Sequence, residues 1–300
     1  MSTQTLIDLS TLPAPSVIEA ISFESILADI KTQFLSLHPA GADVIELESE
    51  PIAKLLECIA FRELSLRARY NDDARSVMLA FSTGADLDHI GATYYQEARL
   101  LISAADDDAI PPVPAVMEAD DTYRHRLALK SESYSVAGPR GAYEFHARSA
   151  SGQVKSVSVT SPIRGTTHIH VLTHTGSGLP DAPLLALVDA AVNAETIRPL
   201  SEDVVVLAAT IIEYTIDIDL TLFAGASTEP ALAAARAALE RFSIDHHQLE
   251  TDIVHSAIDA AAHVAGVKKV VIKSPAADID TGPSEAPYCT AITINIAAIE

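Results

Sequence analysis

The sequence has 300 residues, and its 41 acidic residues outnumber its 20 basic ones, which gives a formal net charge of −21 at pH 7. Nucleic-acid binding requires Lys and Arg to neutralise phosphates, so this charge balance argues against a nucleic-acid partner, and it disfavours anionic membranes for the same reason. The hydrophobic fraction is 48% with only 5% aromatic residues, which predicts a folded chain with a core of small aliphatic side chains.

The N-terminal segment 1–16 is polar and ends in the sequence LPAPS. It has neither the basic start nor the apolar run of a signal peptide, and no stretch of the sequence predicts a membrane span. We therefore expect residues 1–16 to form an extended arm. We also expect the protein to be made in a reducing cytoplasm, where Cys58 and Cys289 stay unpaired.

Residues 17–102 are predicted to form a helical module. After Ser22, a candidate N-cap, apolar residues recur with the spacing i, i+3, i+4, i+7 over residues 23–34. This spacing places them on one face of a helix. The face predicts a first amphipathic helix that packs against a second one.

The second helix of this module is predicted to begin at Pro51, because proline is tolerated in the first turn of a helix. Its apolar residues continue as far as Phe81, and Gly84 is placed to end it. Asp86 is then expected to cap a short third helix.

Arginines of the second helix stand out on an otherwise acidic chain. Arg62, Arg67 and Arg69 could pair with carboxylates of another protein. The simpler interpretation is surface pairing within the helix, with Glu57 and Glu63, at about 0.3–0.5 kcal/mol for each pair. The sequence leaves both alternatives open.

A change of composition follows at residues 103–121, which contain three consecutive aspartates, Asp106 to Asp108, and three prolines between positions 111 and 114. Proline removes a backbone donor and fixes φ, so this segment is expected to lack regular structure. We interpret it as an acidic, proline-rich linker or long surface loop. Its stretch 103–119 is either a hinge between domains or a solvated loop whose ends are pinned by packing.

The rest of the chain predicts two small α+β units, at residues 122–210 and 211–300. In the first unit, a helix at 123–129 is expected to be capped by Asp120 or Asp121. The further expected elements are helices at 142–150 and 183–195 and strands at 154–159, 168–172 and 204–207. In the second, the expected elements are a strand at 211–223, helices at 230–242 and 253–263, and strands at 267–273 and 291–297. Segregated helices on mostly antiparallel sheets define the α+β class.

Histidines are the first candidates for a metal site. His168 and His170 share one face of a predicted strand, and His174 is near in sequence. No recognisable spacing supplies the remaining ligands of a three- or four-ligand site, so we expect solvent-facing strand histidines. His246 and His247 do not form the HExxH motif, and we expect them in a polar loop.

Other polar motifs also lack a catalytic pattern. Ser177 lies in the turn sequence GSG, which lacks the GxSxG spacing of a nucleophile elbow. The run at Asp106 lacks the alternation of a calcium-binding loop, and Asp217 and Asp219 fit the solvent face of an amphipathic strand. We therefore predict no catalytic residue, no cofactor-binding residue and no metal ligand. This favours a structural or interaction protein over an enzyme.

Six segments, in order along the chain, resemble the baseplate J-like family of contractile tails. Together they lie within roughly residues 50–225, and the most specific is SVAGPRGAYEFHA. The segments are FRELSLRARYN at 61–71, LAFSTGADLDHIG at 79–91, DTYRHRL at 121–127, SVAGPRGAYEFHA at 135–147, VSVTSP at 157–162 and IRPLSEDV at 197–204.

The resemblance implies a subunit of the baseplate wedge of a contractile phage tail. Such subunits pair with other copies of themselves and join a smaller wedge protein through a helical bundle. They form a ring around the central spike, lie close to the sheath and spike proteins, and support sheath attachment and the trigger of contraction. The resemblance implies assembly in the bacterial host cytoplasm, a final place in the virion tail, and no cofactor.

Two rival functions remain at this point. The same resemblance fits the equivalent subunit of a tail-derived bacteriocin or another contractile injection system. A cell-wall hydrolase carried on a tail would instead need a converging set of acid, base or metal-binding residues. The sequence offers no such set.

Overall fold

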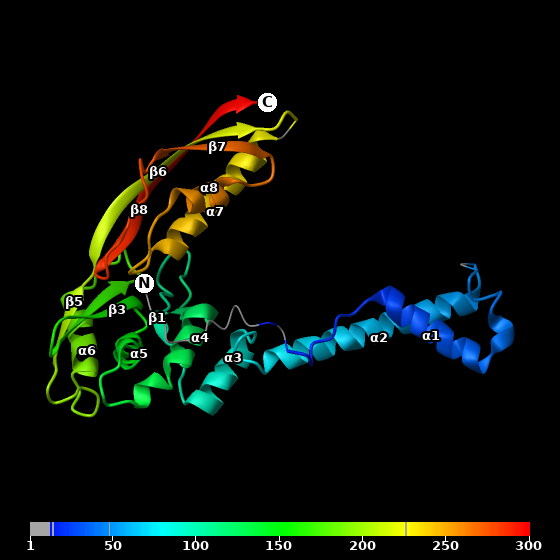
Figure 1. The fold of residues 1–300 in the computed structure, drawn as a ribbon, viewed down its shortest axis with the longest axis horizontal. Helices are drawn as coiled ribbons and strands as arrows, with labels where there is room; N and C mark the ends of the chain where they lie inside the picture. The colour runs from blue at the N-terminus through cyan, green and yellow to red at the C-terminus, as the bar shows by residue number, and fades with distance from the viewer. Residues whose placement is uncertain (1–12, 14, 48, 226) are drawn as a thin grey trace. The chain divides into compact units, whose positions relative to one another are not determined.

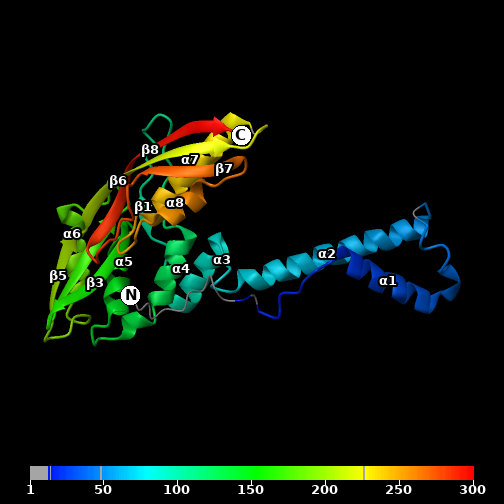
Figure 2. The same cartoon turned by 45° about the horizontal axis from the view of Figure 1, so that its top comes forward.

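The computed structural model describes residue 13 and residues 15–47, 49–225 and 227–300 (Figure 1, Figure 2). The chain divides into two compact units, Met1–Ala98 and Arg99–Glu300. Most of the arm expected at residues 1–16 lies outside the described residues. The first unit is helical, and the second combines helices with small sheets. The predicted α+β class is therefore confirmed.

Helix α1 (Phe23–Leu37) begins where the sequence predicts. Ser22 is its N-cap, and the Ser22 hydroxyl accepts a hydrogen bond from the backbone N–H of Ser25. Before this helix, the buried amide of Asn71 pairs with the backbone of Glu19, accepting from its N–H at 3.0 Å and donating to its carbonyl at 2.8 Å. This double hydrogen bond ties the chain ahead of α1 to the following long helix.

Helix α2 (Pro51–Ser76) begins at the predicted proline but ends five residues before Phe81. Beyond it, Met78 N–H bonds to the Arg75 carbonyl, and Phe81 N–H bonds to the Met78 carbonyl. These three-residue turns keep apolar side chains at nearly helical spacing. That spacing is why the sequence pattern overruns the end of the helix.

Gly84 does not end α2 but opens the next helix, α3 (Gly84–Ile90). Its φ of +54° is a conformation that glycine adopts without a steric penalty, and it redirects the chain into the new helix. Thr83 is the N-cap, and Asp86 lies inside the first turn, so the predicted Asp86 cap is wrong. A π-helical turn, η3 (Gly91–Tyr95), completes the unit.

The second unit begins with a β-hairpin in the segment expected to lack regular structure. Strands β1 (Leu101–Ser103) and β2 (Val116–Met117) pair antiparallel, and an isolated bridge joins Asp106 to Val113. The prolines fall between these paired positions, where no backbone N–H is required. Both strands belong to the second compact unit.

The base of this hairpin is held by a buried ionic cluster. Arg126 is only 1% exposed, and its guanidinium donates to both carboxylate oxygens of Glu118, at 3.1 and 2.8 Å. Arg99 donates to the Glu118 carbonyl at 2.6 Å and pairs with Asp120 at 2.7 Å. The guanidiniums of Arg99 and Arg126 lie over the Tyr123 ring, 5.0 and 5.2 Å from its centre. We call these five residues the hairpin anchor.

Helix α4 (Asp120–Leu129) starts close to the predicted position, but neither expected aspartate caps it. The N-cap is Ala119, which offers no side-chain oxygen. Asp120 pairs with Arg99, and Asp121 pairs with Arg124 at 2.6 Å. Both carboxylates lie in the first turn, where they still favour the positive end of the helix dipole.

The central lobe follows, and its sheet has the strand order β3-β4-β5. The β3–β4 hairpin is antiparallel as predicted, and β5 adds to β4 in parallel. Val157, Ile169 and Val204 point from the sheet into a core formed with the helices. The elements are η4 (Glu132–Tyr134), α5 (Arg140–Ala150), β3 (Val154–Ile163), β4 (Thr166–Thr173), α6 (Ala182–Val192) and β5 (Asp203–Ala208).

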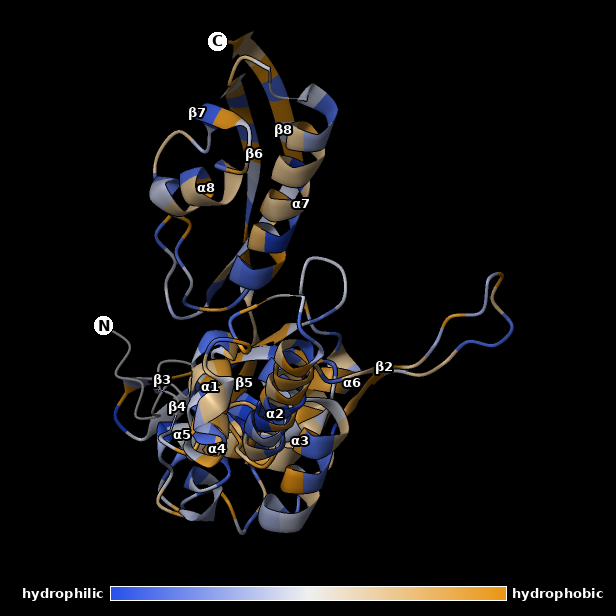
Figure 3. Ribbon diagram, turned by 90° about the vertical axis from the view of Figure 1, so that its right-hand side faces the viewer, coloured by the Kyte–Doolittle hydropathy of each residue, from blue (hydrophilic) through white to orange (hydrophobic). Residues whose placement is uncertain are grey.

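The C-terminal lobe repeats the scheme of one antiparallel and one parallel pair, in the order β7-β6-β8. Alternate side chains of β6, such as Ile216, Ile218 and Leu220, are fully buried, and Figure 3 shows α7 and α8 on one side of the sheet. The elements are β6 (Thr210–Leu222), α7 (Thr228–His246), α8 (His255–Ala262), β7 (Val267–Ser274) and β8 (Glu285–Ile299). The finer division of the chain into five segments stays a prediction.

The hairpin anchor predicts a large cost for removing one of its charges. Glu118→Ala leaves Arg126 buried beside an empty position, so we expect a loss of about 3–5 kcal/mol in the free energy of unfolding. Asp121→Ala, which removes the partner of Arg124 from a 97% exposed position, should cost less than about 1 kcal/mol. Urea unfolding of the full chain measures both. Equal effects of the two substitutions would contradict a structural role for the anchor.

Candidate functional site

The candidate site is an exposed apolar row on α2. Helix α2 packs against α1, and Ala53, Leu56 and Ala60 on one of its faces are buried. A second row, separated by steps of four and seven residues, lies on a neighbouring face and remains exposed. This row, which we call the α2 stripe, consists of Leu55, Ile59, Leu66, Tyr70 and Val77, with exposed fractions of 57%, 44%, 50%, 67% and 72%.

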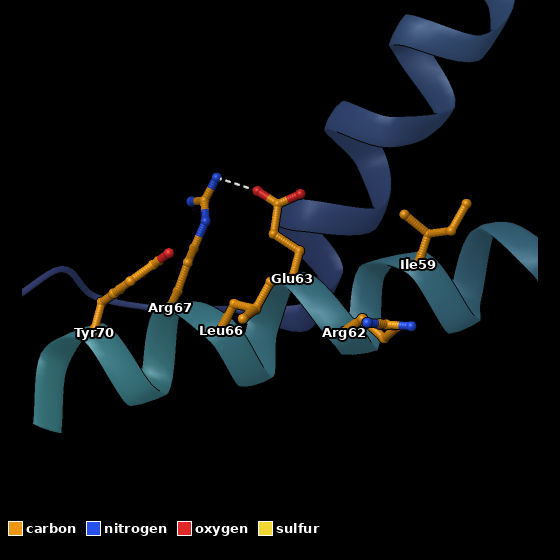
Figure 4. A pocket seen from close by; sticks show the side chains of 6 residues that line it. All are labelled: Ile59, Arg62, Glu63, Leu66, Arg67 and Tyr70. Atoms are coloured by element: carbon orange, nitrogen blue, oxygen red, sulfur yellow. Dashed lines mark hydrogen bonds and ion pairs between the residues drawn. The ribbon is translucent and has the colours of Figure 1, made fainter. Parts of the chain in front are cut away.

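The middle of the stripe forms an open pocket whose lining mixes apolar and charged side chains (Figure 4). Arg67 pairs with Glu63 at 2.5 Å and lies 3.8 Å from Glu19. Figure 4 shows Arg62 pointing away from the Arg67–Glu63 pair. The pocket lining consists of Ile59, Arg62, Glu63, Leu66, Arg67 and Tyr70.

The arginines of α2 divide between the two roles that the sequence left open. Arg67 is used within the module, and Arg69 lies 4.0 Å from Asp73 at the surface. Glu57 pairs with Lys54 at 3.0 Å rather than with an arginine. Within the described ranges, Arg62 makes no ion pair. Arg62 therefore remains available to a carboxylate of another molecule at the edge of the stripe.

The spacing and chemistry of the stripe suit a helical partner. Apolar residues that recur every three or four positions, with charges beside them, form the seam by which helices pack in coiled coils and bundles. A contiguous exposed apolar row is typical of an interaction surface, whereas single exposed apolar residues are ordinary. The α2 stripe is therefore a candidate surface for contact with another protein.

The two histidines predicted to share a face of β4 do so. The rings of His168 and His170 have centroids 6.2 Å apart, but both side chains are half-buried rather than open to solvent. Burial lowers the pKa of His170, and that of His174 is lowered by burial and by Lys155. Among the described residues, no three His, Cys, Asp or Glu side chains gather as a metal site would require.

The sequence predicts that His246 and His247 lie in a polar loop, but His246 belongs to α7 and His247 is buried. His246 ends α7 and stacks on Phe242, with ring centroids 3.9 Å apart. His247 is 8% exposed; its Nδ1 faces Lys155 Nζ at 3.2 Å, and its Nε2 faces the Ser177 carbonyl at 3.2 Å. Lys155 can only donate, so His247 accepts at Nδ1 and donates from Nε2 as a neutral ring. The contact of Ser177 with His247 is therefore made by the backbone carbonyl of Ser177 and not by its hydroxyl.

Acidic residues outside α2 make local contacts. Asp219 pairs with Lys273 at 2.6 Å on the outer face of the C-terminal sheet, and Asn295 donates to both Asp217 and Asp219. This is the solvent face predicted for the strand. The first residue of the acidic run, Asp106, accepts from the backbone N–H groups of residues 108 and 109 and organises the tip of the hairpin.

Both cysteines are free thiols, Cys58 exposed on α2 and Cys289 half-buried on β8. In the described part of the chain, no helix has the length and hydropathy needed to cross a membrane.

Sequence periodicity identifies the apolar residues of α2 but does not separate the buried ones from the exposed ones. Leu55 and Leu56 are adjacent, so they point about 100° apart on a helix and cannot both face α1. The signal in the sequence for an exposed apolar face was that the apolar side chains of this helix point in more directions than one neighbouring helix can cover. The contacts of Lys155 with His247 join positions 92 residues apart and left no trace in the local pattern.

Models of the baseplate J-like family match the chain in three successive parts. The Baseplate J-like N-terminal domain matches residues 48–106, the Baseplate J-like central domain residues 135–208, and the Baseplate J-like protein C-terminal domain residues 214–295. The chain therefore belongs to the baseplate J-like family. It is also 48% identical, over 290 residues, to Baseplate protein J of Escherichia phage P2, a match that covers 95% of this chain and 96% of that protein.

The buried His247 predicts a loss of stability in acid. Burial and the Lys155 ammonium lower the pKa of His247 to about 4, whereas the unfolded chain keeps a value near 6.5. The unfolded state therefore binds more protons between these values, so this contribution is complete above pH 6.5 and is lost as the pH falls towards 4.

We expect this loss to be on the order of 1–3 kcal/mol, and His247→Gln should flatten it. His246→Gln, which leaves the Lys155 contact in place, is the control. Urea unfolding from pH 7 to pH 4 measures the difference between the two variants. Identical slopes would contradict this role of His247.

The stripe should be dispensable for the fold of the free chain. Leu66→Ala removes an exposed side chain and should change the local stability of α2 by less than about 0.5 kcal/mol. Leu56→Ala, in the same helix but buried against α1, should cost about 2–5 kcal/mol. Hydrogen exchange of the α2 amides reports both values. Equal loss of protection would show that the stripe is covered within the chain.

Proposed function

We propose that this chain is a structural subunit of the wedge in a contractile phage-tail baseplate. The observation that carries the proposal is the family match, which runs through all three parts of the chain in order, together with the relative that covers 95% of it. A baseplate role places the chain in the virion tail, in association with other baseplate and tail proteins.

The partner of the α2 stripe, in this proposal, is a smaller wedge protein that contributes a helix to a bundle. Fully burying a side chain such as leucine or isoleucine stabilises a complex by about 1.5–3 kcal/mol before the costs of association. The stripe offers five large side chains that are each 44–72% exposed. Arg62 at its edge supplies a charge that can fix the register of the partner helix.

Copies of the chain are proposed to form a ring around the central spike and to support the sheath. A net charge of −21 favours this controlled assembly, because like-charged copies repel until a specific partner brings them together. The same fold would serve in a tail-derived bacteriocin or another contractile injection system. The particle from which the protein is purified distinguishes these alternatives.

The bundle is tested by placing charges on the stripe. Ile59→Asp combined with Leu66→Asp should leave the free chain folded, because both side chains are exposed. The variant should lose co-purification with the smaller wedge protein by at least about 100-fold, since two charges would be buried at a helix seam. Size-exclusion chromatography of the two co-expressed proteins measures the complex.

Phe61→Asp is the matched control, because Phe61 is also apolar and 62% exposed but lies on the opposite side of α2. This variant should still form the complex. If the stripe variant assembles normally, the stripe is not the bundle seam. If the unmodified chain fails to restore baseplates in a phage lacking its own subunit, the assignment as a baseplate subunit is wrong.

A further inference from the structure

The central and C-terminal lobes of the second unit are joined by almost no connecting chain. Strand β5 ends at Ala208 and β6 begins at Thr210, so only Ala209 lies between them. Ala209 N–H bonds to the Val171 carbonyl of the central lobe, and Thr210 N–H bonds to the Ser284 carbonyl of the C-terminal lobe. Two successive amides are thus anchored in different lobes, which makes this peptide the pivot between them.

The apolar contact beside the pivot is small. It consists of four buried side chains, whereas the core of the C-terminal lobe has thirteen and that of the central lobe has eleven. The four are Leu172, Ala209, Leu249 and Ala286. Each lobe therefore carries its own core, and a small interface of this kind holds two bodies weakly.

Polar contacts complete the junction, and they converge on one loop. The loop after α7, residues 247–250, reaches across to β3. Ser158 Oγ donates to the Glu250 carboxylate at 2.5 Å, and Arg140 lies 3.7 Å from the same oxygen. The N–H of Leu249 donates to Ser156 Oγ at 3.4 Å. We call these contacts the Glu250 latch.

Lys155, next to Ser156 on β3, holds the start of the same loop. Its ammonium donates to the Ile244 carbonyl at 3.3 Å and to His247 at 3.2 Å. His247 in turn bonds to the Ser177 carbonyl. The loop is therefore fastened to the central lobe at both ends, by hydrogen bonds that water can replace at a small net cost.

Glu250 itself is held in an unfavourable backbone conformation. Its φ of +59° lies in the left-handed region, which is uncommon for residues other than glycine. Its N–H bonds to the Glu285 carbonyl within the C-terminal lobe, and its side chain bonds to the central lobe. A strained residue that bridges two bodies gains backbone freedom when the bodies separate.

We propose that the Glu250 latch is a releasable lock that fixes the angle between the two lobes, and that the lobes rotate about the Ala209–Thr210 peptide when it opens. Rigid-body rotation about an interface of few contacts is a common way in which packed domains switch. A subunit of a ring that rearranges needs two stable shapes, and the lock would supply them. Only this use in the tail rests on the proposed function; the lock itself is inferred from the contacts between the lobes.

The test measures the distance between the lobes in the purified full chain. Nitroxide labels are placed at two exposed positions, Glu195→Cys in the central lobe and Arg236→Cys on α7, with Cys58 and Cys289 replaced by serine. Pulsed electron resonance should then give one narrow distance distribution. Glu250→Gln combined with Ser158→Ala should add a second distance, with its population rising about tenfold, from about 1% to about 10%.

Lys155→Met, at the other end of the loop, should produce the same second distance and serves if the first variant does not fold. Asp219→Asn is the control, because it removes a carboxylate that contacts Lys273 and Asn295 within the C-terminal lobe. An unchanged single distance in a folded latch variant overturns the proposal. The measurement needs no baseplate. If the latch variant shows the second distance while the unmodified chain fails to restore baseplates, the proposed function is wrong and the latch stands.

Discussion

A helix can direct only part of its apolar surface towards one neighbour, and this constraint shapes the helical unit. In α2, the side chains facing α1 are buried, while Leu55, Ile59 and Leu66 point about a quarter to a third of a turn away and stay exposed. The helical unit therefore has a buried face between its two helices and a second apolar face that the unit itself leaves exposed. That combination is typical of a component built to be joined by another chain, which agrees with membership in a baseplate family.

In the second unit, the constraint is how two separate lobes are held together. Two small mixed sheets, each covered by its own helices, are joined through one residue, and the polar loop around Glu250 sets their relation. Charged side chains fix position in both places: the buried pair of Arg126 and Glu118 holds the hairpin base, and the partly buried Lys155 holds the loop after α7. Hydrogen bonds and ion pairs are directional, so they fix geometry more sharply than apolar contact does.

Local periodicity predicted the order and type of nearly every element, because side-chain alternation and helical spacing are properties of short segments. It failed where distant residues decide. Asp120 lies inside α4 and pairs with Arg99 instead of capping the helix, and Gly84 begins α3 although it was expected to end α2. The prolines of residues 103–121 argue against regular structure, but strand pairing there uses only positions that they do not occupy. The sequence shows that the residues of the α2 stripe are apolar, but only the packing of α1 against α2 in the structure shows that they are exposed.

The one-residue junction at Ala209 also bears on how such chains can diverge. Strand β6 buries every second side chain, so inserting or deleting one residue near Thr210 would turn Ile216 and Ile218 outward and Asp217 inward. The neighbouring amides would also lose their separate anchors in the two lobes. Changes of length should therefore be purged here during evolution and accumulate instead at the tip of the hairpin, where Ile110 is 99% exposed and the chain can lengthen without disturbing a core.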